Sequence, residues 1–149
     1  MTFRAACLIL AWIPGLVCQA AQHPGLAPIE ATQDRERRSR LALKFAQSRI
    51  DAATQAYRMD DLDKGAGELD ALGDAVELAV KSLESTGRNP RRNPGPFKRA
   101  EIRTRKLLQQ LHHARREAHP EDREAFDGAI ERVETANHQL LLGIMSPKK

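Results

Sequence analysis

Apolar side chains recur along this chain at alternating spacings of three and four residues, which is the period of one face of an α-helix. The pattern predicts four helices, over residues 34–59, 61–85, 96–118 and 120–142. Each helix has one apolar face that neighbouring helices must cover, so we predict an all-α fold. The most regular apolar face belongs to the fourth helix and consists of Phe126, Ile130, Val133, Ala136 and Leu140.

The four predicted helices have matched lengths of about 22–26 residues, or roughly 33–39 Å at 1.5 Å per residue. The connections after the first and third helices are short, which makes each pair antiparallel. We therefore predict a single helical domain over residues 34–145, with hairpins at 34–86 and 97–145 and a joint at 87–96. Two architectures satisfy this pattern: an antiparallel four-helix bundle, or two helical hairpins stacked side by side.

Proline and glycine mark the predicted helix boundaries. Pro94 or Pro96 suits the first position of the third helix, and Pro120 suits the first position of the fourth. Gly87 suits the left-handed residue that follows the second helix, and Gly143 is expected to end the fourth helix.

Three further glycines fall inside the second predicted helix. Gly65 and Gly67 are expected to lie in a loose first turn. Gly73 indicates either a close approach of two helices or a hinge, and we favour the close approach.

The joint between the hairpins begins the most basic part of the chain. Its prolines, Pro90, Pro94 and Pro96, keep it out of a regular helix. Residues 87–106 contain one acidic residue, Glu101, so their positive charge is not neutralised locally. We predict that this segment docks an anionic partner, either a protein or an anionic component of the cell envelope. The candidate partner-binding residues are Arg88, Arg91, Arg92, Lys98, Arg99 and Arg103.

Two other charged segments stand out. The first helix starts with a run of arginines, which oppose the helix dipole, so this end is expected to fray or to meet an acidic partner. The second helix is acidic, and its charges indicate either a solvated face or matching with cations on neighbouring helices. The arginines are Arg35, Arg37, Arg38 and Arg40, and the acids are Asp60, Asp61, Asp63, Glu68, Asp70, Asp74 and Glu77.

The first twenty residues have the layout of a secretory signal peptide. Arg4 precedes a stretch from Ala5 to Cys18 that carries no charge, and Ala20 ends a small-residue motif suited to cleavage. The uncharged stretch is shorter than the roughly 20 residues that span a bilayer. We therefore predict export to the periplasm or the medium, without a transmembrane anchor in the mature chain. Lipid attachment at Cys18 stays open.

Cleavage after Ala20 leaves a chain whose first part, residues 21–33, is expected to be a flexible tail. It removes both cysteines, so the mature protein has neither a disulfide nor a thiol nucleophile. It also removes Arg4, which lowers the formal net charge from +4 to +3. This charge is too small to indicate nucleic-acid binding, and Phe97 is the one aromatic residue placed among the cations to stack on a base.

Signals for an enzyme are missing from the sequence. It contains no phosphate-binding glycine loop, zinc-protease helix motif or hydrolase nucleophile elbow, so we expect no catalytic residue and no cofactor. A weak metal site is conceivable at His112 and His119, with His113 and Glu117 nearby.

The prediction is therefore an exported, non-enzymatic binding protein. One alternative is a self-assembling structural protein, a homo-oligomer in which apolar faces pair between chains, and a less favoured one is a metal-responsive envelope sensor that uses the histidines.

Overall fold

The computed structural model describes residues 25–145, and all regular structure in this range is helical, as the apolar period predicts. The helices are α1 (Ala27–Glu30), α2 (Arg35–Arg58), α3 (Leu62–Glu84), α4 (Gly95–Glu117) and α5 (Ala125–Met145), with a 3-10 turn at Pro120–Asp122. The predicted signal peptide lies outside the described residues. Within residues 25–145, no helix combines the length and the apolar character that a membrane crossing requires.

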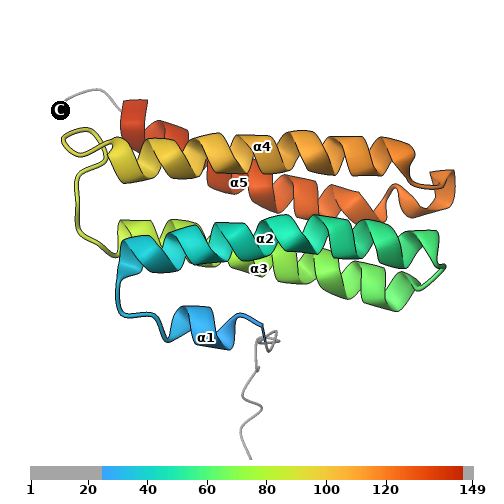
Figure 1. The fold of residues 1–149 in the computed structure, drawn as a ribbon. Helices are drawn as coiled ribbons and strands as arrows, with labels where there is room; N and C mark the ends of the chain where they lie inside the picture. Colours follow the sequence, from blue (N-terminus) through green and yellow to red (C-terminus); the bar gives the residue numbers. More distant parts are fainter. Residues whose placement is uncertain (1–24, 146–149) are drawn as a thin grey trace, which may run out of the picture.

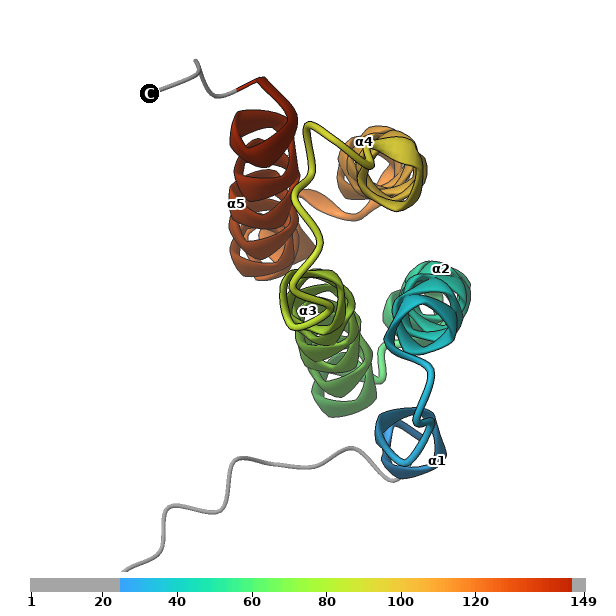
Figure 2. The ribbon, with the colours of Figure 1, turned by 90° about the vertical axis from the view of Figure 1, so that its left-hand side faces the viewer.

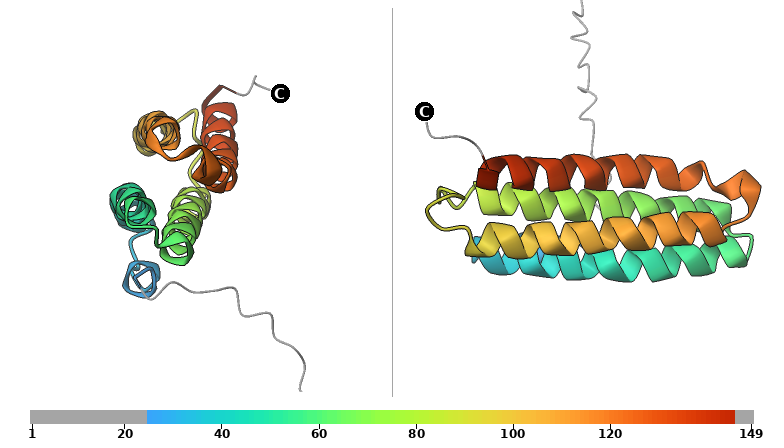
Figure 3. Two further views of the ribbon diagram at one scale, coloured as in Figure 1. Left: turned by 90° about the vertical axis from the view of Figure 1, so that its right-hand side faces the viewer. Right: turned by 90° about the horizontal axis from the view of Figure 1, so that it is seen from above.

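The four long helices pack around one core, and consecutive helices run in opposite directions (Figure 1). Seen from the end, α4 lies above α2 on the right, and α5 lies above α3 on the left (Figure 2). The two tight connections, α2–α3 and α4–α5, lie at one end, and the joint crosses from α3 to α4 at the other (Figure 3). The starts of α2 and α4 therefore meet at the same end of the bundle.

The turns follow the local signals in the sequence. Asp61 caps α3, since its Oδ1 accepts a hydrogen bond from the Lys64 backbone amide at 3.2 Å. Asp60 before it has φ 56°, a left-handed conformation that aspartate tolerates better than most residues. At the far end of α3, Gly87 has φ 69°, which is the left-handed position predicted for it.

The core fills with leucine, valine and alanine, and the predicted apolar faces of α2 and α5 are buried. The apolar spacing of α3 also predicts that Leu62 and Ala66 face the core, and this is wrong, since Leu62 is 53% exposed and Ala66 is exposed. Gly65 takes the inward position because the ring of Tyr57 lies against it. Tyr57 in turn packs on Phe126 of α5, with ring centroids 5.2 Å apart. Gly65 therefore belongs to a continuous helix and makes room for an aromatic ring.

The boundaries of α5 differ from the prediction at both ends. Pro120 starts a 3-10 turn rather than the helix, because His119 before it is extended (ψ 146°) and the chain still has to turn back toward α5. At the other end, α5 continues through Gly143 to Met145. Gly143 faces Pro90 of the joint, whose Cγ would lie 3.4 Å from an added Cβ. The end of α5 therefore packs beside the joint.

The part of the predicted tail that the structure describes contains a helical turn, α1, which the sequence pattern did not indicate. Leu26 before it is only 4% exposed and belongs to the core cluster. Gly25 sits against the ring of Phe45 on α2, so close that an added Cβ would lie 2.6 Å from the ring. Burial of these apolar groups attaches the segment to the side of the bundle (Figure 1).

Several of the acids on α3 are matched across the bundle, which is one of the two readings that the sequence left open. Glu68 pairs with Arg49 of α2 at 2.8 Å. Arg132 of α5 lies over Gly73 and pairs with Asp74 and Glu77, the latter at 2.7 Å from Nε. Gly73 thus admits a guanidinium group from α5 rather than a helix backbone or a hinge.

The Arg132 guanidinium is firmly held in its charged form. Its partial burial alone would lower the pKa of Arg132, but the hydrogen bonds to Glu77 and Asp74 raise that pKa on balance.

A polar contact sets how α4 and α5 meet. Asn137 Nδ2 donates to the Thr104 hydroxyl at 2.8 Å and to the Glu101 carbonyl at 3.1 Å. Thr104 is fully buried, and its own hydroxyl donates to the Glu101 carbonyl at 2.9 Å. A shift of one helix along the other would leave these buried groups without partners, which is costly. The contact therefore favours a single register between the two helices.

The two glycines near the start of α3 offer a matched test of the core. Gly65→Ala should destabilise the protein by about 1–3 kcal/mol, because the new Cβ would lie 2.6 Å from the Tyr57 ring. Gly67→Ala should stabilise it by about 0.5–1 kcal/mol, since Gly67 has no atom within 4 Å of an added Cβ and alanine favours helix. Urea unfolding followed by circular dichroism measures both. Equal shifts for the two variants would contradict the packing described here.

Candidate functional site

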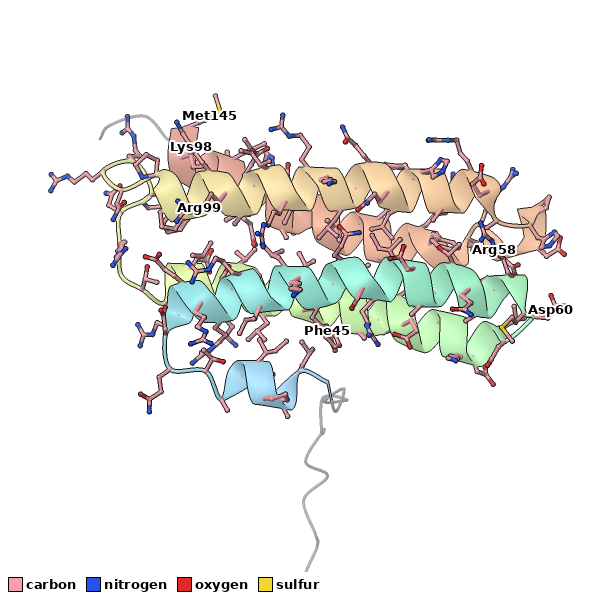
Figure 4. All side chains as sticks on the ribbon, in the orientation of Figure 1. Phe45, Arg58, Asp60, Lys98, Arg99 and Met145 are labelled. Atoms are coloured by element: carbon pink, nitrogen blue, oxygen red, sulfur yellow. The ribbon has the colours of Figure 1, made fainter. Side chains whose placement is uncertain are left out.

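The six predicted partner-binding residues lie together at one end of the bundle, and all six are exposed. Arg88, Arg91 and Arg92 are in the joint, and Lys98, Arg99 and Arg103 are on the first turns of α4. Figure 4 shows Lys98 and Arg99 at this end, opposite Arg58 and Asp60.

The fold adds a second set of cations to the first. Since α2 and α4 start at the same end, the arginine run at the start of α2 lies beside the joint and the first turns of α4. We call this surface the basic end. Its cations are Arg35, Arg37, Arg38, Arg40, Arg88, Arg91, Arg92, Lys98, Arg99 and Arg103, and the acids of the same segments are Asp34, Glu36, Glu84 and Glu101.

Three of these arginines form hydrogen bonds or ion pairs that connect segments at this end of the bundle. Arg88 of the joint forms an ion pair with Glu36 of α2. Arg35 donates to the backbone carbonyl of Ser85 at the end of α3, where the helix dipole favours a cation. Arg38 donates twice to the Thr32 carbonyl, at 2.9 and 2.6 Å. The arginine run at the start of α2 therefore has structural partners, and the helix forms from Arg35 onward.

Most of the remaining cations have no partner among the described residues. The side chains without a hydrogen bond or ion pair there are those of Arg37, Arg40, Arg91, Arg92, Lys98 and Arg99. Glu101, the single acid of the basic segment, is buried and pairs with Arg105 at 3.3 Å, so it does not neutralise them. Asp34 acts on Arg37 and Arg40 electrostatically. Among the described residues, the side chains of Arg91, Arg92, Lys98 and Arg99 therefore remain without a direct partner.

A small cavity of about 30 Å³ opens between α2 and α4 within the basic end. Leu43, Leu83 and Ala100 form its apolar wall. Its polar lining consists of Glu36, Ser39, Arg40, Arg99 and Arg103. Arg103 reaches across from α4, and its Nη1 lies 3.5 Å from the Arg40 carbonyl on α2.

The histidines and Phe97, which the sequence also suggested as site residues, do not gather into a site among the described residues. Within the described residues, no three His, Cys, Asp or Glu side chains come close enough together to hold a metal ion. His112 instead lies 3.7 Å from Glu134 of α5. Phe97 is 3% exposed and belongs to the core, so it cannot stack on a nucleic-acid base.

Sequence reasoning singled out the joint with the first turns of α4 and, separately, the arginines at the start of α2, but it did not bring the two sets onto one surface. Arg40 and Ser39 are about sixty positions from Arg99 and Arg103, and nothing local links them. The available signal was topological, because an antiparallel order of four helices brings the starts of the first and third to one end.

No protein-family model matches this chain, and no curated protein or solved structure matches it either. The function is therefore argued from its own residues.

The start of α2 depends on one acid among the arginines. Asp34 caps the helix, since its Oδ1 accepts a hydrogen bond from the Arg37 amide at 3.0 Å. This hydrogen bond is the largest influence on the carboxyl group and lowers the pKa of Asp34.

Asp34→Ala should lower the melting temperature at pH 7, because the cap and its negative charge are lost. A depressed folded-state pKa gives stability that is present above the unfolded value of 3.8 and is lost as pH falls through the folded value. The gap between wild type and variant should therefore narrow below pH 4, as thermal unfolding can measure. A gap of constant size from pH 7 to pH 2.5 would contradict the capping role.

Proposed function

We propose that this chain is an exported, non-enzymatic helical protein that docks an anionic partner, either a protein or an anionic envelope component, through its basic end. One observation carries the proposal. Arg91, Arg92, Lys98 and Arg99 are exposed on adjoining segments and have no acidic partner among the described residues. Keeping like charges close together costs electrostatic energy, and an anionic partner would relieve that cost.

The bundle suits this role because packing fixes the backbone from which the cations project. Arg88 of the joint pairs with Glu36 of α2, and Pro90 of the joint packs against Gly143 of α5. A partner then meets a preformed charged surface and orders little of it on binding, which favours affinity. Clustered positive charge also raises the association rate with an anion, and added salt lowers that rate.

The self-assembly alternative gains no specific support. It needs apolar helix faces that remain open for pairing between chains, whereas most apolar side chains of the four helices are buried within one chain, with Ile102 and Leu142 among the exposed ones. The metal-sensor alternative likewise lacks a third ligand near its histidines among the described residues.

A charge-matched pair of variants tests the docking proposal. Arg91, Arg92 and Arg99 are changed to serine in one variant, and Arg58, Arg116 and Arg123 are changed in the other. The second set is exposed and lies at the opposite end, so both variants lose three positive charges (Figure 4). Fluorescence titration with polyglutamate should show at least a tenfold loss of affinity and a weaker salt dependence for the first variant only.

Both variants should remain helical by circular dichroism, because all six side chains are exposed. Equal losses in the two variants would mean that only net charge matters, and the basic end would then have no special role.

Export is the second part of the proposal and is supported by the uncharged stretch from Ala5 to Cys18 and the small-residue motif that ends at Ala20. Intact mass and N-terminal sequencing of the exported protein should give a chain that starts at Ala21. A chain that starts at a lipid-modified Cys18 would show lipidation instead. Retention of Met1 on the exported protein would contradict cleavage.

A further inference from the structure

The cavity between α2 and α4 differs from the rest of the basic end because it combines charge with enclosure. Arg40 comes from α2, and Arg99 and Arg103 come from α4, so arginines line it from both helices. Glu36 is the single acid in the lining, and it already pairs with Arg88. The lining therefore carries more positive than negative charge, and among the described residues Arg99 has neither a hydrogen bond nor an ion pair.

Ser39 adds a directed donor to this charge. The residue is 2% exposed and lines the cavity, and its hydroxyl makes no hydrogen bond to another described residue. Among the described residues, the fully enclosed polar atoms without a hydrogen bond are Gln110 Oε1 and Arg115 Nε, so the Ser39 hydroxyl is accessible from the cavity. Serine in a helix commonly donates to the carbonyl four residues earlier, as Ser82 does to Leu78 at 2.6 Å, but Ser39 makes no such bond. A group inside the cavity would supply the missing acceptor.

The size of the cavity limits what this acceptor is. One water molecule needs a cavity volume of roughly 10–15 Å³. The volume of about 30 Å³ therefore has room for around two oxygen atoms and not for a larger group. The rest of a ligand has to stay outside, among the exposed arginines. A phosphate group fits this description, since its oxygens point in several directions and its charge exceeds that of a carboxylate. Guanidinium forks bind such oxygens in pairs.

We infer that this cavity binds a phosphate group, with the Ser39 hydroxyl donating to one oxygen and Arg40, Arg99 and Arg103 surrounding the others. The inference rests on the proposed function and narrows the anionic partner to one that carries phosphate. Both α2 and α4 start near the cavity, and the positive ends of their dipoles add to its attraction for an anion.

Two charge-matched double variants test the site. Arg99→Gln with Arg103→Gln removes two lining cations, and Lys106→Gln with Arg116→Gln removes two exposed cations of α4 that do not line the cavity. Isothermal titration with inorganic phosphate in chloride buffer should show an affinity loss of about tenfold or more for the first variant and under about threefold for the second.

A second pair isolates the hydroxyl. Ser39→Ala should weaken phosphate binding by about tenfold without a change in net charge, whereas Ser48→Ala should not, since Ser48 lies exposed on the same helix and bonds the Phe45 carbonyl. Alanine favours helix, so both variants should fold. Unchanged phosphate affinity in Ser39→Ala would overturn the assignment of the hydroxyl as a ligand.

Sedimentation with phosphatidylglycerol vesicles distinguishes the sources of phosphate. A selective loss of vesicle binding in the Arg99 and Arg103 variant indicates a lipid headgroup, and a selective loss with inorganic phosphate alone indicates a free or terminal phosphate. Equal losses for both double variants in both experiments would overturn the inference. Polyglutamate carries no phosphate, so intact polyglutamate binding in that case would leave the proposed function standing.

Discussion

The burial of four narrow apolar faces against one another is the constraint on which this structure depends. The core contains few aromatic rings, and much of it is alanine and leucine, so the helices have to come close to fill it. Tyr57 and Phe126 provide bulk at the end with the tight turns, where Gly65 leaves space for the tyrosine ring. Small residues facing large ones thus give a close-packed interior without a disulfide.

The order in which the four helices pack around the core determines which charged side chains lie near oppositely charged ones. With tight turns at one end, the single longer connection has to cross at the other, next to the starts of α2 and α4. Charges along the sides find partners on neighbouring helices, as Arg132 does with Asp74 and Glu77. Charged side chains at the basic end have fewer helices beside them, and those of Arg91 and Arg92 are exposed to solvent. The uneven distribution of paired and unpaired cations is therefore a consequence of topology.

The basic end contains arginines that bond to the protein and arginines that do not, and their contacts distinguish the two groups. Arg35 and Arg38 bond backbone carbonyls, and Arg88 pairs with an acid, so these three stabilise the end of the bundle. Arg40 and Arg99 have no such partner and line a cavity with a buried hydroxyl group. A functional role is consequently more convincing for the second group than for the first, although the sequence presents both as similar basic runs.

The sequence by itself determined the helical class, the approximate helix bounds and the exposed basic joint, because apolar period, proline and net local charge act over a few residues. It misplaced the start of the apolar face of α3, because the ring of Tyr57 overrides the local pattern there. It also placed the start of α5 too early, because the chain first makes a 3-10 turn at Pro120. Only the tertiary structure decided that Ser39 and Arg40 lie with Arg99 and Arg103. That meeting depends on how two distant helices pack, and packing distance is not encoded in the spacing of residues along either helix.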